Sequence, residues 1–294
     1  IGLQPVYLSV KLFDEDFPYS QNEDTEFGVR MVAQGLSLHY RVAPSCRHHS
    51  PFLFDNFFYK VWQAGISKAY WSEKSPNETN FANFLRRIVM NKSKEAEYDA
   101  LFEDYIQTFG KDSFDCDINQ WDTVTYAHFK TLMDNAVAWK ADMGIYDGWE
   151  RFIPAFTDIA ADVLQANTLK NVKKRIEVLR TAWQRNPAFL PMALLLADEL
   201  AQAKQYKDAC DVLEKMDQSL PVLSRLYLEY NHTGQNRKSI DIALRVYDEA
   251  CRPLAIHMDF RKKATTHLMR LCKNEKLTQS WISNALQSIH LEEY

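Results

Sequence analysis

The chain has 294 residues, of which 46% are hydrophobic and 25% charged, a composition typical of a soluble protein with one or two globular domains. Its net charge of −4, with acidic and basic residues interspersed, argues against a nucleic-acid-binding protein and against a polybasic membrane patch. The five cysteines are widely spaced and form no Cys-x-x-Cys pair, which favours reduced thiols in a cytoplasmic protein. No apolar run approaches the length of a transmembrane segment.

The first fifty residues contain two predicted strands on either side of an acidic segment. Residues 5–12 and 36–42 alternate apolar and polar residues, as half-buried strands do. Between them, residues 13–30 read FDEDFPYSQNEDTEFGVR. A helix is expected to begin after Asn22, which can cap it, and to end before Gly35. Because the sequence opens in strand-like residues without a methionine, we expect it to be a segment of a longer polypeptide.

From Pro51 onward the pattern is almost entirely helical, with Gly and Pro expected between the helices. The candidate helices include 53–64, 120–142 and 148–166. Residues 77–167 are interpreted as a helical connecting region.

The last third of the chain shows an internal repeat. Pro187 and Pro221 are 34 residues apart, each is expected to end a helix, and a further copy aligns Gln205 with Gln235. A period of 34 with paired helices is typical of tetratricopeptide (TPR) repeats, which stack to bury their apolar faces. The sequence therefore predicts TPR-like hairpins within residues 168–294, with a non-repetitive helical bundle as the alternative.

Two acidic pairs could carry chemistry. Asp14 and Asp16 have the spacing with which many sugar transferases hold a metal-bound nucleotide diphosphate, but they precede a Phe-Pro turn, where acidic residues are common. Glu23 and Asp24 lie at a predicted helix start, where carboxylates compensate the helix dipole. A carboxylate fixed in that place is also suited to act as a general base.

His48 and His49 form a third candidate group, in a loop after the second predicted strand. Paired loop histidines are usually surface residues. They can also supply neutral imidazole ligands to a divalent ion.

A succession of short motifs runs through this part of the chain. It consists of Leu8-Ser9, Phe13-Asp14-Glu15, Phe17, Glu23-Asp24, Glu26-Phe27, Arg30, Gly35, Pro44 and His48/His49. In order and spacing it resembles the C-terminal part of the catalytic domain of family 2 glycosyltransferases, which have the GT-A fold. The stretch FFYKVWQAGISKAYWSEKSP is similar to the helix-Gly-helix segment that often ends such domains. The resemblance covers roughly residues 5–76.

The resemblance implies an enzyme that transfers a sugar from a nucleotide-sugar donor to an acceptor hydroxyl with inversion. Asp24 would be the catalytic base and Glu23 would help to position the acceptor. His48 or His49 would approach a Mg²⁺ or Mn²⁺ ion or the diphosphate. The nucleotide-binding half, with its metal-binding aspartates, would lie upstream of Ile1.

We therefore expect a mainly α chain. Residues 1–76 would be the C-terminal fragment of an α/β GT-A domain, residues 77–167 a connecting region, and residues 168–294 TPR-like repeats that dock a glycan or protein acceptor, or a protein partner. A non-catalytic TPR-like protein-binding scaffold is the alternative function. A cytoplasmic location is expected. A weaker hypothesis is that the aromatic stretch PFLFDNFFYKVW binds peripherally to the inner face of the membrane. The other interpretation of this stretch is a buried helix.

Overall fold

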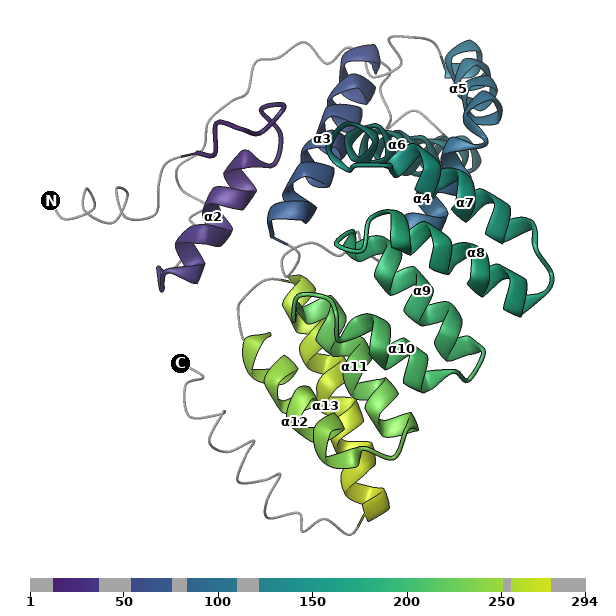
Figure 1. Ribbon diagram of the computed structural model, residues 1–294. Helices are drawn as coiled ribbons and strands as arrows, with labels where there is room; N and C mark the ends of the chain where they lie inside the picture. The colour runs from purple at the N-terminus through teal and green to yellow at the C-terminus, as the bar shows by residue number, and fades with distance from the viewer. Residues whose placement is uncertain (1–12, 37–53, 76–83, 110–121, 251–254, 276–294) are drawn as a thin grey trace, which may run out of the picture. The chain divides into compact units, whose positions relative to one another are not determined.

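The computed structural model describes residues 13–36, 54–75, 84–109, 122–250 and 255–275 (Figure 1). All regular secondary structure within these ranges is helical, which confirms the prediction of a mainly α chain. The two predicted strands lie outside the described residues, apart from Leu36, so the α/β part of the expectation stays a prediction.

The described residues divide into two compact units, each with its own packing. Unit 1 falls within Ile1–Lys74 and Arg86–Thr157, and unit 2 falls within Ser75–Leu85 and Asp158–Tyr294. Unit 1 therefore combines residues from the predicted GT-A segment with residues from the predicted connecting region.

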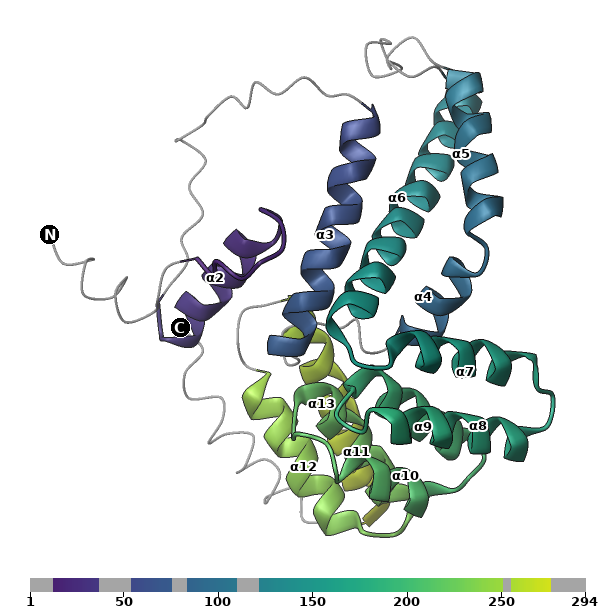
Figure 2. The same ribbon diagram turned by 45° about the horizontal axis from the view of Figure 1, so that its top comes forward.

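Unit 1 contains two long helices, α3 and α6, that pack along each other (Figure 2). Its helices are α2 (Glu23–Ala33), α3 (Phe54–Lys74), α4 (Leu85–Lys92), α5 (Glu95–Phe109) and α6 (Thr123–Phe152). Their shared core is large and apolar, with Phe58, Ile88 and Trp149 at most 3% exposed. Burial of this kind is the main favourable contribution to the stability of a helical unit.

Glycines set the distance between α3 and α6. Gly144 and Gly148 lie about one turn apart on α6, and Gly65 meets Gly144 from α3. A Cβ added at Gly144 would overlap the carbonyl oxygen of Trp62, and one at Gly148 would lie 2.6 Å from the Cβ of Ala69. No larger side chain fits at this crossing. The sequence predicts helix ends near these glycines, and this is wrong because each glycine lies inside a helix.

The aromatic stretch at the start of α3 takes part in this packing. The ring of Phe58 is buried and meets Phe102 of α5 edge to face, with centroids 4.9 Å apart. Phe129 of α6 belongs to the same cluster. These contacts support the buried-helix interpretation of the stretch. Within the part of the chain that the structure describes, none of the helices combines the length and apolar composition needed to cross a membrane.

Unit 2 is a row of helices in which neighbours in sequence are neighbours in space. Its helices are α7 (Phe156–Thr168), which begins at the end of unit 1, α8 (Val172–Arg185), α9 (Leu190–Gln202), α10 (Tyr206–Leu213), α11 (Leu220–His232), α12 (Asn236–Glu249) and α13 (Ala255–Glu275). Each helix from α8 to α12 packs against the next one in the chain. This arrangement is compatible with stacked helical hairpins, and their TPR-like character stays a prediction.

The hairpins repeat with two different spacings. α7 and α9 begin 34 residues apart, at Phe156 and Leu190. α11 begins only 30 residues after α9, at Leu220. The shortening lies in the second helix of the hairpin, since α8 has 14 residues and α10 has 8.

Prolines occupy equivalent positions in two of the repeated helices. These positions are at helix starts, whereas the sequence predicts prolines at helix ends. Pro191 and Pro221 both lie in the first turn of a helix, α9 and α11 respectively. Proline is tolerated there because its missing N–H would have no partner within the helix. The prediction that Pro221 ends a helix is therefore wrong, whereas Pro187 does follow the end of α8.

The turns after α9 and α11 have the same backbone geometry. Lys204 and Gly234 both take a left-handed conformation, with φ of 61° and 75°. The next residues, Gln205 and Gln235, donate their N–H to the carbonyl oxygen five residues earlier, at 2.9 and 2.8 Å. This helix-ending pattern satisfies carbonyl groups that the helix leaves unpaired. The predicted alignment of Gln205 with Gln235 is confirmed.

Candidate functional site

The segment before α2 is attached to α3 by aromatic and polar contacts. Phe17 meets Tyr70 edge to face with ring centroids 5.1 Å apart, and Tyr19 meets Trp62 at 5.9 Å. The hydroxyl of Ser67 donates to the carbonyl oxygen of Tyr19 at 3.4 Å. The aromatic residues of FDEDFPY therefore hold this part of the chain against α3.

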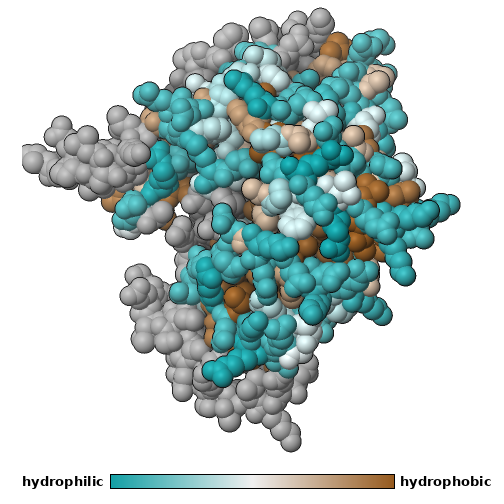
Figure 3. All heavy atoms as spheres, viewed as in Figure 1, coloured by the Kyte–Doolittle hydropathy of each residue, from teal (hydrophilic) through white to brown (hydrophobic). Residues whose placement is uncertain are grey.

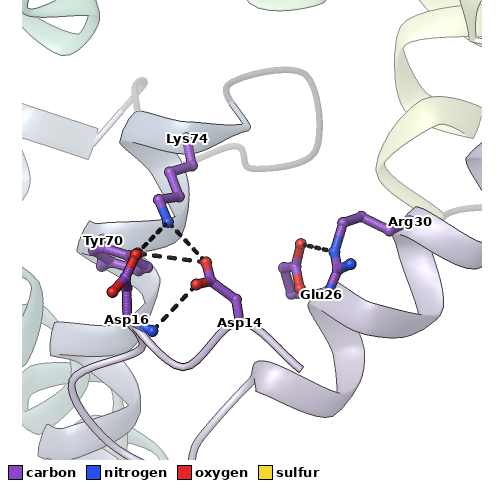
Figure 4. Close-up of polar contacts among 6 residues, drawn as sticks. All are labelled: Asp14, Asp16, Glu26, Arg30, Tyr70 and Lys74. Carbon is purple, nitrogen blue, oxygen red and sulfur yellow. Dashed lines mark hydrogen bonds and ion pairs between the residues drawn. The ribbon is translucent and has the colours of Figure 1, made fainter. Parts of the chain in front are cut away.

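Asp14 and Asp16 face a lysine (Figure 4). One oxygen of Asp14 accepts hydrogen bonds from Lys74 Nζ at 2.8 Å and from the Tyr70 hydroxyl at 3.3 Å, and Lys74 also lies 3.5 Å from Asp16. Burial raises the pKa of Asp14, but the hydrogen bonds from Lys74 and from the Asp16 backbone outweigh it and leave that pKa below its usual value. The ammonium group occupies the position between the carboxylates that a metal cation would take. This geometry favours the structural interpretation of the pair.

Asn22 fixes the start of α2 in a way that the sequence does not predict. It precedes the helix as expected, but its side chain makes no cap hydrogen bond. Its Nδ2 instead donates to the carbonyl oxygen of Ala64 on α3, at 3.2 Å. Its left-handed φ of 68° is a conformation that asparagine tolerates better than most residues. At the other end of α2, Gly35 takes a left-handed φ of 81°, which confirms the predicted end of the helix.

Glu23 and Asp24 form the first turn of α2 and differ in their surroundings. Asp24 is exposed, and its Oδ1 accepts a bond from the backbone N–H of Thr25 at 2.7 Å. Glu23 is half-buried, and its Oε2 is shielded from solvent without a hydrogen-bond partner among the described residues. One carboxylate is therefore open to an incoming molecule, while its neighbour has an unused acceptor oxygen.

Glu26 is a buried carboxylate that the sequence analysis includes in the motif succession without giving it a separate role. It is 6% exposed, and its Oε1 accepts a hydrogen bond from Arg30 Nε at 2.5 Å (Figure 4). The spacing of four residues between a glutamate and an arginine on one helix is the signal that could have identified this pair. The buried pair helps to fix α2, and Glu26 Oε2, like Glu23 Oε2, has no hydrogen-bond partner among the described residues.

The predicted metal ligands cannot be placed. His48 and His49 lie outside the described residues. Within the described ranges, no three His, Cys, Asp or Glu side chains gather in a way that could hold a metal ion. The metal site therefore stays a prediction.

Comparisons with known proteins do not assign the chain to a family. No family model matches the chain, and no curated protein and no solved structure shows a significant similarity to it. The functional argument consequently depends on the residues themselves.

Proposed function

We propose that this chain carries the acceptor side of an inverting glycosyltransferase active site, with Asp24 as the general base. The observation that supports this proposal best is the position of Asp24. Its carboxylate is exposed on the first turn of α2, and the start of that helix is tied to α3 through Asn22 and Ala64. A base must be both accessible and fixed in place, and Asp24 meets both requirements.

In the proposed reaction, the acceptor hydroxyl oxygen attacks the anomeric carbon of a nucleotide sugar. Asp24 accepts the hydroxyl proton as the new glycosidic bond forms and the bond from the anomeric carbon to the diphosphate breaks. Glu23, whose side chain is half-buried, accepts a hydrogen bond from another acceptor hydroxyl at the part of its carboxylate that solvent reaches. The motif succession in residues 8–49 supplies both the class of reaction and the two roles, and the exposure of Asp24 on the first turn of α2 is compatible with its role.

A Mg²⁺ or Mn²⁺ ion, when bound, would stabilise the negative charge on the leaving diphosphate. His48 or His49 remains the proposed ligand within this chain. The described residues offer no alternative set of ligands. We also propose a cytoplasmic location, where nucleotide-sugar donors would be the substrates.

The first test uses the full-length gene product and a panel of nucleotide sugars, with release of the nucleoside diphosphate as the measurement. We expect one donor to be consumed, and we expect Asp24→Asn to lower kcat by about 10²–10⁴-fold, the range for loss of a general base. Donor binding should change little, because the substitution removes only the base.

The matched control is Asp158→Asn, which changes an exposed aspartate in the first turn of α7 and leaves α2 untouched. Equal turnover in Asp24→Asn and in the control would remove Asp24 from the mechanism. If the folded full-length protein consumes no donor, the alternative function, a non-catalytic protein-binding scaffold, becomes the better proposal. The stacked hairpins of unit 2 favour that alternative, since such stacks provide extended binding surfaces.

A further inference from the structure

Unit 2 contains a hollow of about 640 Å³ that is formed by three of its helices, α9, α11 and α13. These are alternate members of the row, so the hollow lies on one face of the stacked hairpins. Its lining consists of Asp198, Ser224, Arg225, Tyr227, Leu228, Phe260, Lys262, Lys263, Thr266, His267 and Arg270. A hollow of this size can accept several side chains of a bound segment.

The charged lining of the hollow is strongly basic. Lys262, Lys263 and Arg270 are exposed and come from α13. Arg225 of α11 adds a fourth cation, and it is already bonded to Asp198 through two hydrogen bonds of 2.7 and 3.0 Å. Asp198 is the one carboxylate in the described lining. Beside the Arg225–Asp198 ion pair, the hollow is therefore lined by three cationic side chains of α13.

The floor of the hollow is apolar. Tyr227 and Phe260 are 2% and 4% exposed, and Leu228 lies half-buried beside them. The hollow therefore combines a basic edge with an apolar base. A ligand that carries both carboxylates and an apolar side chain would match these two parts.

A hydrogen-bond chain holds one of the cations in place. The hydroxyl of Ser239 donates its single hydrogen to the carbonyl oxygen of Tyr227 at 2.5 Å. The Ser239 oxygen can therefore only accept from His267, so His267 Nε2 is the donor in their contact of 2.9 Å. His267 Nδ1 is then the acceptor for Arg270 Nη2 at 3.3 Å. Burial, together with Arg270 and His232, lowers the pKa of His267 to about 4, which keeps the ring neutral at physiological pH. Arg270 is thereby anchored to α11 and α12 through a neutral histidine.

We propose that this hollow binds an acidic peptide segment of a partner protein. Its carboxylates pair with Lys262, Lys263 and Arg270, and an apolar side chain of the segment packs on Tyr227 and Phe260. A peptide suits the hollow better than nucleic acid does, because it can supply an apolar side chain together with its carboxylates. The inference depends on unit 2 alone and not on the transferase proposal.

The test is fluorescence anisotropy with the full chain and a labelled peptide that repeats Asp-Leu-Glu. We expect saturable binding that weakens as salt is added. Lys262→Glu combined with Arg270→Glu should raise Kd at least tenfold, which corresponds to about 1.4 kcal/mol. Lys262→Glu alone, which leaves the His267 chain intact, should give an intermediate loss. Circular dichroism verifies that each variant is folded.

The matched control is Lys173→Glu combined with Lys174→Glu, two exposed lysines of α8 that do not line the hollow. This control makes the same change in net charge, so an equal loss of binding would overturn the proposal. Absence of saturable binding at low salt would also overturn it. Single-stranded DNA that binds as tightly as the peptide, with the same response to the variants, would show a general polyanion surface instead. The assay contains no sugar donor, so its outcome is separate from that of the Asp24 experiment.

Discussion

Two buried glutamates in unit 2 show how one residue can change the chemistry of a repeated position. Glu199 and Glu229 are the tenth residues of α9 and α11. Glu199 accepts a hydrogen bond of 2.5 Å from Arg175, the fourth residue of α8. The fourth residue of α10 is Ala209, which offers no cation to Glu229. Burial, with a further contribution from Asp198, raises the pKa of Glu229 to about 7.

This difference predicts a pH-dependent stability. Because the folded-state pKa of Glu229 lies above its ordinary value of 4.5, the folded chain holds the proton more tightly than the unfolded chain. Its contribution to stability is complete below pH 4.5 and is lost as the pH rises through 7. Glu229→Gln removes the titration, so the variant should gain about 2–3 kcal/mol relative to the parent between pH 5 and pH 8.

Urea unfolding at the two pH values, monitored by circular dichroism, measures this gain. Glu177→Gln, at an exposed position of α8, is the matched control. A Glu229→Gln variant whose stability follows the parent at both pH values would contradict the assignment of a buried, proton-holding carboxyl.

The contact between α3 and α6 makes the main prediction for secondary-structure elements. Gly144→Ala introduces a Cβ against the carbonyl oxygen of Trp62, a backbone atom that cannot move by changing a rotamer. Alanine favours a helix over glycine by about 1 kcal/mol, but overpacking of a rigid contact costs more. We expect a net loss of about 2 kcal/mol or more in the free energy of unfolding.

Chemical denaturation of Gly144→Ala beside Thr131→Ala, on an exposed part of the same helix, checks this expectation. The control should change stability by less than about 0.5 kcal/mol. A Gly144→Ala variant as stable as the control would mean that the two helices can separate without cost.

These same glycines explain where the sequence predicts helices well and where it fails. The ends of α2 were predictable because Asn22 and Gly35 are local signals that need no tertiary information. Gly65 and Gly144 resemble local helix-end signals as well. Their role, however, is to let the backbones of α3 and α6 approach closely, and the sequence of one helix does not indicate which helix it packs against. Likewise the proposed role of Asp24 comes from its motif alone, whereas the bond from Asn22 to Ala64 joins residues that are distant in sequence.

At the scale of the whole molecule, the division into two units predicts that unit 2 can fold by itself. Its helices pack mainly against neighbours in the chain, so their contacts are local and do not wait for distant segments. A fragment from Asp158 to Tyr294, which contains unit 2 except for Ser75–Leu85 and the first two residues of α7, should be strongly helical and should unfold in one cooperative transition, as measured by circular dichroism on heating. A fragment that is helical but melts gradually would show that the row of hairpins needs other parts of the chain.

The close crossing of α3 and α6 also has a mechanical consequence for the acidic segment. At this crossing the backbones of the two helices are in direct contact, because a Cβ on Gly65 or Gly144 would overlap the backbone of the other helix. α3 presents Ala64, Ser67 and Tyr70 to the segment that leads into α2. The start of α2, which carries Asp24, is therefore bonded to a helix whose close contact with α6 depends on Gly65 and Gly144.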